Sequence, residues 1–155
     1  MHSYRISFSG NIVKRGFWIY IWRIAHSSGV YYYVGRTGDS SSANAASPMS
    51  RMSAHFGHNP KGNALKRNLM SIDIDMEECD YDYYCFGPLI DERSTWDEHR
   101  EARDIVATVE YEVAEHLRAQ GCRVIGHHQI KRLSPDPIVK RFTKEITEKL
   151  DREFG

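Results

Sequence analysis

Tyrosine, arginine, histidine and glutamate stand in this sequence at spacings that suit chemistry on an anionic substrate. Tyr20 and Tyr33 lie in two aromatic runs, and Arg51 and His55 are four residues apart. A guanidinium matches two phosphate oxygens at once, and histidine exchanges protons near neutral pH. Glu110 stands in a long helical pattern, beside its apolar stripe, where a carboxylate can overlook a cleft. These groups form a site only if the fold brings them together.

Two strands must hold the tyrosines. Residues 17–24 and 30–36 are rich in aromatic and β-branched side chains and flank a short polar loop, which predicts a β-hairpin. Because side chains alternate along a strand, Tyr33 and Gly35 share one face of the second strand. The glycine leaves room there for a close approach of another group.

A helix must hold the arginine and the histidine. Ser47-Pro48 is a favourable start, because serine is a good N-cap and proline suits the first helical position. Arg51 and His55 then lie one turn apart on the same face.

The longest helix is predicted from about Trp96 to Gln120 and must hold the glutamate. Its apolar stripe leaves Glu110 on one shoulder and Glu112 on the other. Periodicity does not choose between them, and we prefer Glu110 for the reason given below.

These elements predict an α/β fold of the α+β type, with a small, mainly antiparallel three-stranded sheet flanked by helices. A chain of 155 residues that is 41% hydrophobic suits one compact domain, and no linker divides it, so we expect a single domain over 1–155. The other predicted elements are a helix at 63–71, a strand at 80–86, an extended segment at 124–125 and a C-terminal helix at about 137–153.

Charge is unevenly distributed along the chain. The formal net charge is zero, which argues against coating of nucleic acid by bulk electrostatics. Residues 1–70 nevertheless hold nine Lys and Arg against one acid, Asp39, whereas residues 73–104 hold twelve acids against three arginines. The first seventy residues are therefore the part that suits phosphate, unless the charges only form ordinary solvated faces.

Nothing in the sequence suggests a membrane or an oxidising compartment. No apolar run is long enough to span a bilayer, and the first residues lack the apolar stretch of a signal peptide. Three cysteines without a CxxC pair indicate neither a disulfide framework nor a zinc site. We expect a cytoplasmic protein with no membrane contact.

The segment from residue 16 to residue 56 resembles the GIY-YIG nuclease family. The run GFWIY stands at the first motif, Tyr33-Val34-Gly35 matches the second, and a helix with Arg51 follows. Downstream, Glu110 looks like the metal-binding glutamate of the family, because the valine and leucine spacing after it fits the family helix. The loop before Arg51 is longer than the compact family form. The asparagine that the family often places after the glutamate helix is replaced here by a stretch containing His127 and His128, either of which could substitute for it.

The resemblance implies a divalent-metal-dependent endonuclease that hydrolyses phosphodiester bonds in DNA. Glu110 would hold one Mg²⁺ or Mn²⁺, and Arg51 would stabilise the charge that develops on the phosphate. Tyr20 or Tyr33 would contact the water or the phosphate. We place the general base on Tyr20, with His55 as the alternative base or a phosphate contact. The residues expected to contact the nucleic-acid backbone are Arg36, Lys61, Lys66 and Arg67.

Two other functions fit the same residues. The domain would be a catalytically inactive GIY-YIG-like module that binds nucleic acid, an interpretation that the missing asparagine supports. Alternatively, it would be a protein-interaction domain whose acidic segment docks a basic partner. Cutting both strands of DNA with one small active site would favour a homodimer or repeated encounters with the DNA.

Overall fold

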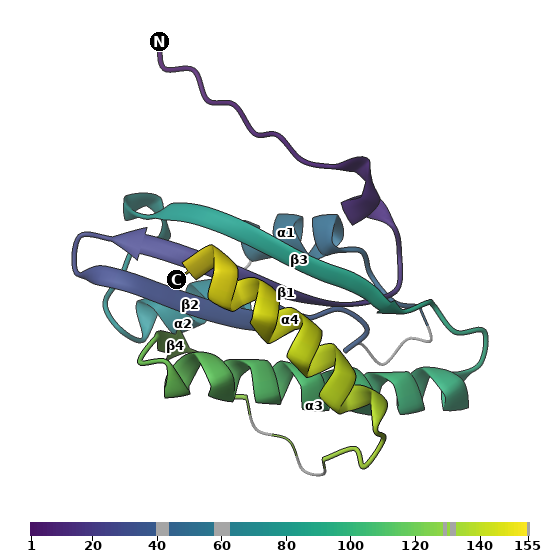
Figure 1. Ribbon diagram of the computed structural model, residues 1–155. Helices are drawn as coiled ribbons and strands as arrows, with labels where there is room; N and C mark the ends of the chain where they lie inside the picture. Colours follow the sequence, from purple (N-terminus) through teal and green to yellow (C-terminus); the bar gives the residue numbers. More distant parts are fainter. Residues whose placement is uncertain (40–43, 58–62, 129, 131–132, 155) are drawn as a thin grey trace.

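The computed structural model describes residues 1–39, 44–57, 63–128, 130 and 133–154, and it shows an α+β fold (Figure 1). A four-stranded mixed sheet has the order β3-β1-β2-β4. The strands are β1 (Phe17–His26), β2 (Gly29–Arg36), β3 (Asp80–Ile90) and β4 (Arg123–Ile125). The helices are α1 (Pro48–His55), α2 (Ala64–Met70), α3 (Trp96–Ala119) and α4 (Ile138–Phe154), with short 3₁₀ turns η1 (Gly10–Val13) and η2 (Met76–Glu78).

Strand β1 is central because both of its faces are apolar. One face carries Tyr20, which packs in a cluster with Leu65 and Leu69 of α2. The other face carries Ile19 and Ile21, which pack against α3 and α4. The sheet is therefore the middle of three layers, with α1 and α2 on one side and α3 and α4 on the other (Figure 1).

The predicted hairpin and fold class are confirmed, but the sheet has four strands where the sequence predicts three. β1 pairs antiparallel with β2 and β3, while β4 pairs parallel with β2. The sequence indicates only an extended segment at 124–125, because three residues are too few to show a strand period. β3 also continues past the predicted stop at residue 86, and a register shift in its pairing with β1 accommodates Gly87 and Pro88.

The helix that carries Arg51 and His55 begins where its capping residues predict. The Ser47 hydroxyl accepts a hydrogen bond from the Ser50 backbone N–H at 3.2 Å, and Pro48 is the first helical residue. Thr95 caps α3 in the same way through the N–H of Glu98. Within the part of the chain that the structure describes, no helix is both long and apolar enough to cross a bilayer.

Candidate functional site

The hairpin places Tyr20 and Tyr33 side by side on the face of the sheet that α1 covers. Tyr20 is paired with Gly35, and Tyr33 with Trp22. The ring of Tyr20 lies directly on the backbone of Gly35, so closely that a Cβ at this position would overlap the ring. Only glycine fits at position 35 with Tyr20 in this conformation.

Helix α1 brings His55 against both tyrosines. Nε2 of His55 lies 2.9 Å from the hydroxyl of Tyr20, and its ring centroid is 5.4 Å from that of Tyr33. The pair is deeply buried, since Tyr20 is 1% exposed and His55 is 5% exposed. Asn63, the cap of α2, donates its side-chain amide to the backbone carbonyl of His55 and so fixes the end of α1.

Burial sets the protonation of this pair. It raises the pKa of Tyr20 above its usual range, with the nearby tyrosine Tyr33 adding to the effect and Arg51 opposing it. Burial, aided by the positive charge of Arg51, lowers the pKa of His55 to about 4. Both groups are therefore neutral at pH 7. When Nε2 carries no proton, the Tyr20 hydroxyl donates to it.

Arg51 lies beside the pair and reaches toward solvent. Its guanidinium forms an ion pair of 2.8 Å with Asp39, the single acid of the first seventy residues. Its positive charge opposes the rise in pKa of both Tyr20 and Tyr33, so it lies near enough to act on both hydroxyl groups. The sequence does not predict Asp39 as part of the site. Its isolation among nine cations is the one signal that points to it.

Glu110 enters from α3, and its carboxylate forms an ion pair with the guanidinium of Arg36. Burial raises the pKa of Glu110 to about 7, although the charge of Arg36 opposes this shift. The negative charge of Glu110 in turn helps burial to raise the pKa of Tyr33 to about 12. Glu112 faces a different neighbour, since it accepts a hydrogen bond of 2.7 Å from Thr143 of α4.

Of the five predicted catalytic side chains, His55 therefore contacts both Tyr20 and Tyr33, and the charges of Arg51 and Glu110 lie near enough to act on the two tyrosines. Three of these side chains are partly accessible: Tyr33, Arg51 at 30% and Glu110 at 13%. The buried part is the Tyr20–His55 pair. The set is Tyr20, Tyr33, Arg51, His55 and Glu110.

The residues predicted to contact nucleic acid do not all lie in the site. Arg36 belongs to the site itself, because it pairs with Glu110. Arg67 of α2 is exposed and lies near enough to Tyr33 to oppose the rise in the pKa of Tyr33. Lys66 is half-buried on the same helix, and Lys61 lies outside the described residues.

His128 closes the site from the side of β4. Its Nδ1 lies 3.1 Å from a nitrogen of Arg118, and its Nε2 lies 2.8 Å from the carbonyl of Val34. Because Arg118 only donates and a carbonyl only accepts, Nε2 carries the proton. This histidine thus ties the segment after β4 to the residue between Tyr33 and Gly35. The sequence indicates that one of two adjacent histidines could take such a place.

Two cavities among the described residues lie away from this site. A cavity of about 420 Å³ lies between α3 and the segment that leads into α4, and it contains none of the predicted site residues. Its polar lining is acidic, with Glu101, Asp104 and Asp136. An acidic wall repels phosphate, so this cavity does not suit nucleic acid.

Comparison of the chain with protein-family models, with curated proteins and with solved structures returned no match. Function must therefore be argued from the geometry of the site.

Proposed function

We propose that this chain is a divalent-metal-dependent endonuclease that hydrolyses phosphodiester bonds in DNA. The observation that carries the proposal is the buried Tyr20–His55 hydrogen bond with a guanidinium and a carboxylate beside it. Phosphodiester hydrolysis requires a proton acceptor, positive charge for the phosphoryl oxygens and a site for a cation. The arrangement holds one group for each requirement.

Two arginines are available to bind the phosphate. Among the described residues, Arg36 and Arg51 each keep a buried Nε without a hydrogen-bond acceptor. Each guanidinium is held by one carboxylate, Glu110 or Asp39. A phosphate that takes the place of either carboxylate keeps that guanidinium paired and supplies further acceptor oxygens.

The residues present suit Mg²⁺ or Mn²⁺ held largely by water. No cluster of three or more His, Cys, Asp or Glu that could enclose a metal occurs among the described residues. Mg²⁺ is commonly bound through one or two carboxylates while it keeps several waters, and Glu110 is a partly exposed carboxylate of this kind. When bound, the cation would neutralise charge on the phosphate and on the leaving oxygen.

The tyrosine and the histidine would move the proton together. Tyr20 accepts a proton at Oη from the attacking water while its own proton passes to Nε2 of His55, so the phenol stays neutral. This relay avoids a free phenolate, which burial disfavours at this position. The low pKa of His55 acts against this relay, because it makes the imidazole a weak final acceptor of the proton.

The test is cleavage of DNA in the presence of Mg²⁺ or Mn²⁺ by the parent, by site variants and by control variants. Each control changes the same residue type outside the site. We expect Tyr20→Phe, Arg51→Ala and Glu110→Gln to lose about a hundredfold or more of the rate. Their controls are Tyr84→Phe on the opposite face of the sheet, Arg100→Ala on the exposed side of α3 and Glu112→Gln. Equal loss in a variant and its control, with both proteins folded, would overturn the assignment of that residue.

A second candidate is a module that binds DNA without cutting it. The burial of the Tyr20 hydroxyl favours this function, because a general base must reach the attacking water. Salt-sensitive binding of DNA that needs Arg36 and Arg51, with no cleavage in either metal, would establish the module and exclude the nuclease.

A further inference from the structure

The first eight residues form an arm with the pattern of a β-strand and no hydrogen-bonding partner among the described residues. Figure 1 shows the arm leaving η1 and projecting away from the layered domain. Tyr4, Ile6 and Phe8 alternate with polar residues and are 87%, 78% and 55% exposed. Residues 1–8 form no hydrogen bond or ion pair with any other described residue. Such a run of exposed apolar side chains at a two-residue spacing is typical of a strand that docks on a sheet.

The sheet offers one long free edge for such a strand. β3 has eleven residues and pairs only with β1, so its outer backbone groups face away from the sheet. No backbone hydrogen bond joins this outer edge to another segment of the chain as far as the structure describes it. The opposite edge is β4, which has only three residues. An exposed edge of this length is a template for an added strand.

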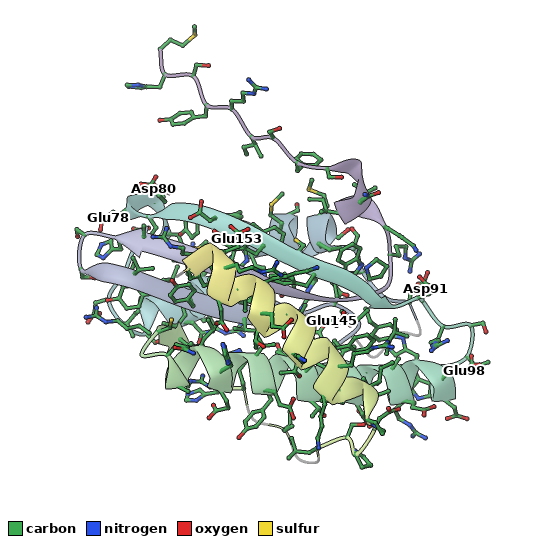
Figure 2. The ribbon with its side chains drawn as sticks, in the orientation of Figure 1. Glu78, Asp80, Asp91, Glu98, Glu145 and Glu153 are labelled. Carbon is green, nitrogen blue, oxygen red and sulfur yellow. The ribbon has the colours of Figure 1, made fainter. Side chains whose placement is uncertain are left out.

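The two faces of β3 differ in chemistry. On the α1 face, Tyr81 packs at 5.1 Å, between ring centroids, against Phe56, which is itself half exposed. On the α4 face, Asp82 forms an ion pair with Arg23, and Tyr84 packs against Phe154. Asp80 has the same parity as Asp82 and is exposed. Figure 2 shows Asp80 and Glu78 together at the beginning of β3, at the end of the strand away from Asp91.

The arm matches both faces at once. If its apolar residues cover Tyr81 and Phe56, alternation places Arg5 on the opposite face, with Asp80 and Asp82. The apolar side chains of the arm then cover apolar area, and its arginine lies beside the acids. The reverse register would place Arg5 beside the aromatic rings.

We propose that the arm of one copy of this chain adds as a fifth strand to the outer edge of β3 in a second copy. Reciprocal exchange of two arms around a two-fold axis makes a closed dimer. The point where the arm joins the domain favours docking on another copy, because it lies at the end of β3 opposite the acids that Arg5 would meet. Lys14 pairs with Asp91, and the indole of Trp18 donates to the carbonyl of Lys14, so the segment below η1 is fixed at the far end of β3 from Asp80. This proposal does not depend on the nuclease activity.

Sedimentation velocity of the full chain over about a hundredfold range of concentration tests the association. We expect a monomer–dimer equilibrium. The triple variant Tyr4→Ser, Ile6→Ser and Phe8→Ser should raise its dissociation constant at least about a hundredfold, because three buried apolar side chains are lost. The matched control is Ser3→Ala with Ser7→Ala, on the other face of the arm. A parent that stays monomeric, or a triple variant that dimerises as the parent does, would overturn the proposal.

A charge exchange shows whether the arm docks on another copy. Arg5→Glu and Asp80→Lys should each weaken dimerisation about tenfold, since each creates a like-charge pair in both halves of the dimer. Mixing the two variants should restore it. In one half of the mixed dimer the introduced glutamate faces the introduced lysine, and in the other half the unchanged Arg5 faces the unchanged Asp80. If mixing restores nothing while both variants remain folded, the arm does not dock on β3 of a second copy.

Discussion

The hydroxyl of Tyr20 and Nε2 of His55 are 2.9 Å apart in a place that solvent barely reaches. One residue comes from the central strand and the other from the last turn of α1, thirty-five positions later. Their contact therefore depends on the packing of α1 on the sheet, and it connects the stability of the fold with the chemistry of the site.

Removing the Tyr20 hydroxyl should destabilise the domain as well as the site. Tyr20→Phe leaves a buried imidazole nitrogen without its partner, and we expect a loss of ~1–3 kcal/mol in the free energy of unfolding. Urea unfolding measures this loss. Tyr31→Phe is the control, because the Tyr31 hydroxyl bonds Ser28 at the surface and its loss should cost little. A similar cost for both variants would contradict a special role of the Tyr20 contact.

Gly35→Ala should disturb the site without touching a polar group. A Cβ at position 35 would overlap the Tyr20 ring, so either the ring or the strand must move. We expect a cost of ~1–3 kcal/mol in the free energy of unfolding and a loss of any cleavage activity. Gly10→Ala is the control, because nothing lies within 4 Å of a Cβ added there. A crystal structure of the Gly35→Ala variant with Tyr20 unmoved would disprove the explanation.

Local sequence patterns predicted most of the fold. The hairpin at Tyr20 and Tyr33, the cap at Ser47 and the long helix around Glu110 all follow from side-chain alternation, capping and helical periodicity. The fourth strand could not be predicted from local patterns, because three residues show no period. The pairing of β4 with β2 also joins segments about ninety residues apart.

The partners within the site were harder to predict than its members. The type and spacing of Arg51 and Glu110 marked them as candidates, but their ion pairs with Asp39 and Arg36 join distant segments and leave no local pattern. The burial of Tyr20 also depends on tertiary packing. An aromatic strand with a polar loop does not reveal which tyrosine hydroxyl is covered by a helix.

Stability between pH 4 and pH 7 should contain two opposing contributions. His55 has a lowered pKa of about 4, so the folded state binds fewer protons than the unfolded state and stability rises with pH up to about 6.5. Glu110 has a raised pKa of about 7, so the folded state binds more protons and stability falls from about pH 4.5 to pH 7. Each contribution amounts to roughly 3 kcal/mol, and in the parent the two largely offset each other.

Single variants should reveal each slope. In Glu110→Gln, stability should rise with pH more steeply than in the parent, whereas in His55→Gln it should fall more steeply. Urea unfolding at several pH values gives these slopes, and Glu112→Gln changes the same residue type on the same helix as a control. Slopes that match the parent in both variants would show that neither group titrates in this range.

Metal binding should depend on pH through the same carboxylate. A cation binds the ionised form of Glu110, and with a pKa of about 7 this form is scarce near pH 6 and dominant near pH 8. We expect the affinity for Mn²⁺, measured by calorimetry, to rise about tenfold between these pH values. Glu110→Gln should abolish the binding and Glu112→Gln should not. Arg36→Ala should move the rise in affinity to higher pH, since removing the guanidinium that opposes the shift raises the pKa of Glu110 further. Equal affinity at both pH values, or binding that survives Glu110→Gln, would place the metal on other residues.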